Sequence, residues 1–316
     1  TGTAVELENS ENGEYETEIE KGGEVALEQF HITRLIHPAF NVRAGHMIVP
    51  VGLTNAHHEP INFFGTYRPE GETTILPSTW HETGIEFFGK GYATFDYQAL
   101  IVTGLNANGF DRNNWVAGGK QGFFEVDNFT SPAYVARLDY RGVPGLRIGG
   151  SFYYCVNTAS NSDKVATYAG VKAPLRIYTV DGQYKNKYVT ARTNFVFGNL
   201  TGATAISNKN KGLSNSSPYT RVVQVAKKAV SYAGEVGVNL RSICNGNKKV
   251  PVIYPFARYE YYNPQEAGEK GQLPMDKRNQ VSMWTAGLNW YALPNLVVKA
   301  DYMTRQIGTG KVFGKG

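Results

Sequence analysis

The sequence contains no run of about 18 consecutive apolar residues, so it predicts no membrane-spanning helix. It also has no Pro-rich or Ser-rich linker and no shift in composition along its 316 residues. Segments with helical periodicity are scarce. We therefore expect one domain over residues 1–316, built from strands rather than helices.

Charge of one sign is not in large excess. The net charge is +5, and acidic side chains stand close to basic ones, as Asp139 does to Arg137. No basic helix and no RNA-binding motif accompanies this small excess. We expect no nucleic-acid partner.

Catalytic and metal-binding patterns are missing as well. The sequence has no nucleophile-elbow spacing and no zinc motif. His57, His58 and Glu59 are adjacent, but neighbouring side chains point apart in an extended chain and no third ligand stands at helical spacing. We expect no enzyme activity, no cofactor and no metal site.

The sequence does contain alternation with a period of two. Around residues 132–154, aromatic and aliphatic side chains alternate with charged or small ones. Successive side chains of a strand point to opposite faces, so this stretch predicts a hairpin with one apolar face and one polar face. We expect Leu138 on the apolar face and Val135 on the polar face, where replacement by arginine would be mild.

The same alternation recurs along the chain and predicts twelve strands. They are expected at 24–34, 39–49, 81–89, 92–104, 132–141, 145–156, 174–184, 188–200, 226–240, 251–262, 281–292 and 295–306. Strands of globular proteins are usually about five or six residues long. A tilted strand that crosses a bilayer needs about 9–11 residues, which is the length found here.

The connections between these strands alternate in length. Short turns are expected near 35–38, 89–91, 141–145, 185–187, 241–250 and 292–295. Long loops are expected near 50–80, 105–131, 157–173, 201–225 and 263–280. Transmembrane barrels keep this order, with short periplasmic turns and long outer loops.

The sequence therefore predicts an all-β fold, an antiparallel transmembrane up-and-down β-barrel in a bacterial outer membrane. The apolar face would meet lipid, with Tyr134, Tyr140, Trp290 and Tyr302 in the interfacial aromatic girdles. A soluble carbohydrate-binding sandwich is the alternative, but it explains neither the strand length nor the alternation of turns.

The stretch "FNVRAGHMIVPVGLTNAHHEPINFF", with its R-x-G-x-x-x-x-P-x-G pattern, resembles the phosphate-selective porin O and P family. The continuation "TYRPEGETTILPSTWHETGIEFFG" is similar to the Bacteroidota branch of these proteins. The resemblance covers about residues 24–306 and implies a barrel of about 16 strands, often a homotrimer, with one loop folded into the lumen. Because only twelve strands are found and the chain ends on "GTGKVFGKG", we expect terminal strands to be missing. The family's phosphate ladder has no residue-by-residue counterpart here.

Charged residues at polar-face positions are the expected pore lining. They are Arg43, Glu86, Asp96, Arg137, Asp139, Arg141, Arg147, Asp181, Arg192, Glu235, Arg258, Glu260, Lys299 and Asp301. With Glu82 and Arg305 added, eight positive charges face eight negative ones. This balance favours a general diffusion pore over a strongly selective one, although the charges could equally serve to satisfy one another.

The long loop 50–80 is expected to fold inward and narrow the pore. Arg68, Glu70 and Glu72 would then lie at the constriction, where charged side chains set ion preference. An ordinary outer loop is the alternative.

These observations predict a porin that passes small hydrophilic solutes and ions by diffusion, with outer-membrane lipids as partners. The alternative is a structural or partner-binding barrel subunit of a larger outer-membrane assembly. The two cysteines, Cys155 and Cys244, are expected at opposite rims about 25 Å apart, too far for a disulfide, which needs Cα atoms within about 7 Å.

Overall fold

In the computed structural model, the described residues are 3–9, 15–21, 29–55, 59–91, 94–121, 128–162, 166–210, 224–247, 249–293 and 295–309. Twelve strands among them form one antiparallel sheet in simple sequence order, from β3 to β14. They are β3 (Phe30–His37), β4 (Phe40–Ile48), β5 (His81–Lys90), β6 (Phe95–Val102), β7 (Ala133–Tyr140), β8 (Leu146–Cys155), β9 (Leu175–Lys185), β10 (Val189–Leu200), β11 (Lys228–Val238), β12 (Val252–Ala267), β13 (Val281–Leu293) and β14 (Leu296–Ile307). The expected all-β, up-and-down order of twelve strands is confirmed.

The boundaries differ most from the prediction at two places. Strand β12 continues to Ala267, five residues into the segment expected as a loop. The first predicted strand, 24–34, corresponds to β3, which begins at Phe30, and residues 24–28 lie outside the described part of the chain. Two further strands, β1 (Thr3–Asn9) and β2 (Tyr15–Lys21), pair only with each other in a separate two-stranded sheet.

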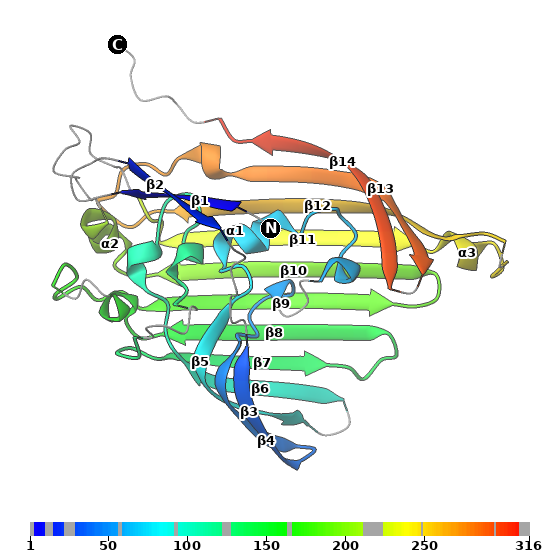
Figure 1. The fold of residues 1–316 in the computed structure, drawn as a ribbon, viewed down its shortest axis with the longest axis horizontal. Helices are drawn as coiled ribbons and strands as arrows, with labels where there is room; N and C mark the ends of the chain where they lie inside the picture. Colours follow the sequence, from blue (N-terminus) through cyan, green and yellow to red (C-terminus); the bar gives the residue numbers. More distant parts are fainter. Residues whose placement is uncertain are drawn as a thin grey trace.

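Short and long connections emerge at opposite ends of the sheet (Figure 1). The short end carries the four-residue helix α3 (Leu240–Ile243) between β11 and β12. The long end carries α2 (Ala203–Lys209), whereas α1 (Glu70–Ile75) lies in front of the sheet near β11 and β12 (Figure 1). Within the described residues, no helix is long and apolar enough to cross a membrane.

The two faces of the sheet differ in exposure as the alternation predicts. In β7, Leu138 is 51% exposed, whereas its neighbours Arg137 and Asp139 are buried at 7% and 6%. The same outward exposure of large apolar side chains recurs in other strands, with Val180 at 56%, Trp284 at 60% and Tyr302 at 74%. The outer face of the sheet is therefore apolar and uncovered, whereas most inner-face positions of the central strands are buried.

The inner face is covered differently at its two ends, which the sequence did not predict. Toward the long loops, inward residues such as Val102, Val135 and Tyr153 are buried in an apolar core together with Trp80 and Trp115 from the loops. Val135 does lie on the inner face, but the expectation that arginine would be mild there is wrong, because this side chain is 3% exposed among apolar neighbours. Toward the short turns, the inner face carries the charges.

Candidate pore lining and the segment that covers it

Four charged side chains of β7, β8 and β9 form a closed group on the inner face, here called the β7–β9 quartet (Arg137, Asp139, Arg147, Asp181). Arg137 lies 2.8 Å from Asp139 and 2.9 Å from Asp181. Arg147 lies 3.0 Å from each of the same two carboxylates. All four residues are buried, so removal of one member would leave an uncompensated charge at a cost of about 3–5 kcal/mol.

A second group lies on β10, β11 and β12, the β10–β12 quartet (Arg192, Glu235, Arg258, Glu260). Arg192 contacts Glu235 at 2.6 Å, and Arg258 contacts Glu260 at 2.7 Å. Arg258 also approaches Glu235 at 3.9 Å, which joins the two pairs into one chain of alternating charge.

The remaining predicted lining residues of the early strands are paired as well. Arg43 of β4 contacts Glu86 of β5 at 2.8 Å, and Gln98 donates to the same carboxylate. Asp96 and Arg141 form an ion pair of 2.7 Å nearer the short end, where both side chains keep substantial exposure. The inner wall therefore presents its charges as neighbouring opposite pairs, and their fields largely cancel a short distance away.

The connection between β4 and β5, described at residues 49–55 and 59–80, folds across this wall rather than away from it. Its backbone is held by the β10–β12 quartet: Tyr67 O accepts from Arg258, and Gly71 N donates to Glu260 at 3.3 Å. Phe64 N also donates to Glu235, at 3.4 Å. These contacts hold residues 64–71 of the loop against the inner face of β11 and β12.

Glu72 is the most enclosed of the three predicted constriction residues. Its carboxylate accepts hydrogen bonds from Thr54 N at 2.7 Å, Leu53 N at 3.2 Å and the side-chain amide of Asn194. Burial raises the pKa of this carboxyl above its ordinary value, although those hydrogen bonds oppose the shift. Glu72 thus ties the two halves of the loop to each other and to β10, and it does not line an open passage.

The other two predicted constriction residues have different partners. Glu70 forms an ion pair with Arg305 of β14 and accepts a hydrogen bond from the hydroxyl of Tyr262. Arg68 donates to Ser78 inside the same loop, at 3.2 Å. Glu70 and Arg305 are both partly exposed, so this ion pair lies on an accessible part of the inner side.

Close packing of the loop on β11 depends on a glycine. A Cβ added at Gly237 would lie 2.3 Å from the Phe64 ring, a distance that real Cβ atoms essentially never show. The Phe64 ring also stacks on Phe256 of β12, with ring centroids 5.5 Å apart. Gly237 therefore leaves the space into which the loop inserts this aromatic side chain.

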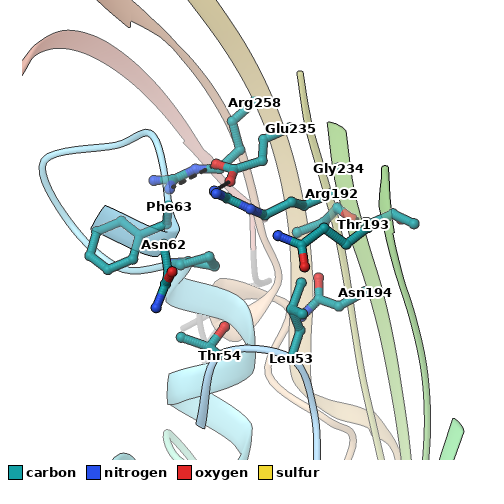
Figure 2. A pocket seen from close by; sticks show the side chains of 13 residues that line it. Leu53, Thr54, Asn62, Phe63, Arg192, Thr193, Asn194, Gly234, Glu235 and Arg258 are labelled. Atoms are coloured by element: carbon teal, nitrogen blue, oxygen red, sulfur yellow. Dashed lines mark hydrogen bonds and ion pairs between the residues drawn. The ribbon is translucent and has the colours of Figure 1, made fainter. Parts of the chain in front are cut away.

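A cavity of about 130 Å³ remains between the loop and the wall (Figure 2). Asn62 and Phe63 border it on the loop side, and Arg192, Glu235 and Asn194 border it on the strand side (Figure 2). Alternation along β10 places Asn194 on the inner face, but no local pattern predicts its contact with Glu72, 122 positions earlier in the chain.

The last two predicted lining residues, Lys299 and Asp301 of β14, reach the same loop. The Lys299 ammonium donates to three backbone carbonyls between Pro60 and Gly65, and Asp301 accepts from Thr66. The structure thus brings most of the predicted lining residues to one inner surface, but much of their hydrogen bonding goes to one another and to residues 52–71.

Of the three adjacent residues considered as metal ligands, His57 and His58 lie outside the described part of the chain, and Glu59 lies within it. Among the residues that the structure describes, no group of three or more His, Cys, Asp or Glu side chains is arranged to hold a metal ion.

No protein-family model matches the chain. An uncharacterized protein of Aquifex aeolicus (strain VF5) is 26% identical over 289 residues, which cover 90% of this chain and 62% of that protein. This chain therefore spans less than two thirds of the length of that relative. The resemblance to the phosphate-selective porin family stays a prediction.

Solved structures of Pseudomonas aeruginosa proteins show distant similarity. OccK10 (OpdN) matches with a TM-score of 0.36 and 13% identity, over 87% of this chain and 77% of that chain. OccK3 (OpdO) matches with a TM-score of 0.33 and 9% identity, over 87% and 73%. OpdK, solved with vanillate, matches with a TM-score of 0.32 and 8% identity, over 85% and 70%.

Proposed function

We propose that this chain forms the wall of an outer-membrane channel through which small hydrophilic solutes and ions diffuse. The observation that carries the proposal is the contrast between the faces of one twelve-stranded sheet. Large apolar side chains such as Leu138 and Trp284 are exposed on the outer face, and charged side chains such as Arg137 and Asp181 are buried on the inner face. Lipid accepts the first surface and an aqueous lumen accepts the second.

Closure of the sheet is part of this proposal. Among the described residues, β3 and β14 are the two edge strands and have no partner on their outer sides. Unpaired backbone groups are too costly in hydrocarbon to face lipid. A closed barrel needs partners for both edges, and a total of about 16 strands, which the family resemblance implies, would supply them.

The wall chemistry supports weak rather than strong selectivity. Each arginine of the β7–β9 quartet and the β10–β12 quartet has a carboxylate partner within 4 Å, so the wall carries little uncompensated charge. Selectivity by charged rings requires such uncompensated charge at the narrowest point. We therefore propose a general diffusion channel, and the phosphate selectivity of the resembling family is not part of the proposal.

The outer face would contact outer-membrane lipids, and part of it would be buried if the protein is a homotrimer, as the resemblance implies. Tyr134, Trp290 and Tyr302 are 45%, 48% and 74% exposed there, which suits interfacial aromatic girdles.

Conductance in a planar lipid bilayer tests the proposal. The full-length protein, purified in detergent in its folded form, is expected to give stepwise current increases, and heat-denatured protein serves as the control. In a salt gradient, the reversal potential is expected to show at most a weak anion preference. Strong cation selectivity would overturn the diffusion-pore assignment.

A second candidate function rests on the covered inner face. Toward the long loops, Trp80, Phe110 and Trp115 are buried against the inner side of the strands. A barrel filled in this way suits a structural or partner-binding subunit of a larger outer-membrane assembly. Inserted and folded protein that carries no current would favour this second function over the channel.

A further inference from the structure

The segment Pro60–Thr66 of the β4–β5 connection lies against β14, the last strand of the sheet. Lys299 of β14 donates to Pro60 O at 2.5 Å, to Phe63 O and to Gly65 O at 3.0 Å. Two positions later, Asp301 accepts from Thr66 N at 2.6 Å and from Thr66 Oγ1 at 3.1 Å. Two neighbouring inward side chains of one strand therefore bind most of the length of this segment.

The Lys299 site matches the chemistry of an ammonium group. A lysine ammonium has three N–H donors, and three carbonyl oxygens of the segment face it. The Phe63 ring lies 4.2 Å from the same nitrogen, which adds a cation–π contact. A neutral side chain at this position would leave three carbonyl groups without their donor.

The segment has little regular structure of its own to fix its shape. It contains one short 3₁₀ turn, Pro60–Asn62, whose Asn62 N donates to Glu59 O at 2.9 Å. Segments with few internal backbone hydrogen bonds open at low free energy unless other contacts hold them. The buried Phe64 ring, stacked on Phe256, and Phe64 N on Glu235 hold the middle of this segment. The other polar contacts from the strands that the structure describes for it come from Lys299 and Asp301.

The segment Pro60–Thr66 forms part of the boundary of the neighbouring cavity. Asn62 and Phe63 form one side of the cavity, and Arg192, Asn194 and Glu235 form the other (Figure 2). If the segment moved away from the wall, the cavity would become part of the lumen. If the segment moved further inward, it would obstruct the lumen. Either movement would change the width of the passage beside this part of the wall.

We propose that Lys299 and Asp301 form a latch that holds Pro60–Thr66 in one position against the wall and thereby gives the channel a single aperture. This inference rests on the proposed channel function. It assigns to these two residues, expected from the sequence to line the pore, the role of positioning residues for the segment that narrows it.

The test compares Lys299→Met and Asp301→Asn with Lys185→Met, which removes an equal charge from the short end of β9, outside the latch. Hydrogen exchange of the peptide that contains residues 60–66 is measured by mass spectrometry on the folded protein in detergent. Exchange is expected to be faster in both latch variants and unchanged in Lys185→Met. Equal exchange in all variants would overturn the latch, whether or not the wild-type protein conducts.

Single-channel recording then tests whether the latched segment sets the aperture. Wild type and Lys185→Met are expected to show one open level, whereas Lys299→Met and Asp301→Asn show added open-channel noise and sublevels. A protein with Thr66→Cys, Asp301→Cys and Cys244→Ser is expected to show one level when oxidised and sublevels after reduction. A single level in the reduced protein and in both latch variants would overturn the role in aperture, and a silent wild type would instead overturn the channel function.

Discussion

The indole ring of Trp115 lies directly against the backbone of Gly198. A Cβ at Gly198 would be 1.9 Å from Trp115 Cη2, and the indole N–H donates to Ala226 O at 2.9 Å. Trp115 belongs to the long β6–β7 connection, and Gly198 is an inward position of β10. One glycine therefore admits the largest side chain of a loop onto the inner face of a distant strand.

Replacement of Gly198 by valine is expected to expel this indole ring. Overpacking in a core typically costs about 1–3 kcal/mol, so the melting temperature of the folded protein in detergent should fall and its tryptophan emission should shift to the red. Gly150→Val is the matched control, because a Cβ at Gly150 would meet only Thr179 O, at 3.7 Å. Equal melting temperatures for the two variants would contradict the packing described for Trp115.

Leu138→Arg is expected to impair membrane insertion. Arginine on the lipid face near the bilayer midplane costs about 2–4 kcal/mol, and Leu138 is 51% exposed on the outer face of β7. The matched control is Gln98→Arg, because Gln98 faces inward on β6 and hydrogen-bonds to Glu86. The folded fraction after refolding into lipid vesicles measures the difference, and equal yields would reject the assignment of faces.

The contribution of Glu72 to the stability of the folded protein is expected to fall as pH rises. Its folded-state pKa lies above the ordinary value of 4.5, mainly because of burial. The folded protein then holds this proton more tightly than the unfolded chain, so the contribution of Glu72 to the free energy of unfolding falls as pH rises from about 4.5 through the folded-state pKa. Glu72→Gln should remove this dependence, measured as the difference in melting temperature between wild type and variant at each pH.

Glu269 provides the comparison of opposite sign. Burial would raise its pKa, but the backbone N–H groups of Thr204 and Gly202 outweigh that effect and hold the pKa below 4.5. Its contribution to stability is therefore present above about pH 4.5 and is lost as pH falls through the folded-state pKa. If Glu72→Gln and Glu269→Gln changed the pH profile in the same direction, the assignment for Glu72 would fail.

The two cysteines are expected to react differently with thiol reagents. Both are free; Cys155 is buried at the long-loop end of β8, and Cys244 is exposed beside α3 at the short-turn end. Their positions at opposite ends of the sheet match the predicted placement. A membrane-impermeant maleimide should label Cys244 alone in the detergent-solubilised folded protein.

The same reagent tests orientation in a Gram-negative host. With short turns on the periplasmic side, Cys244 should be labelled only after the outer membrane is permeabilised. Labelling in intact cells would reverse the orientation, and a Cys155–Cys244 bridge in non-reducing mass spectrometry would contradict the topology.

The strands and their order could be predicted because they depend on local pattern. Alternation with a period of two fixed which side chains of β7 point outward, and connection length separated the two ends of the sheet. Each of the twelve predicted strands overlaps its counterpart. The largest differences are at β12, which continues to Ala267, and at the first strand, of which residues 24–28 lie outside the described part of the chain. The position of the charged residues on a common face followed from the same periodicity.

What covers the inner face could not be predicted, because it depends on contacts between residues far apart in the chain. Lys299 and Phe63 are 236 positions apart, and Asn194 and Glu72 are 122 apart. Nothing in the local sequence of β14 distinguishes a lysine that lines a pore from one that binds the backbone of a loop.

Val135 and Arg137 show most clearly which features follow from the local sequence and which depend on the tertiary structure. The sequence by itself determined that both point inward from β7, since they are two positions apart on one strand. Only the tertiary structure decided that Val135 lies in the apolar core beneath the long loops, while Arg137 lies in the β7–β9 quartet and donates to Gly52 O at 3.2 Å. The physical reason is that strand geometry sets the direction of a side chain locally, whereas the environment it meets is set by whichever loop folds back over that part of the sheet.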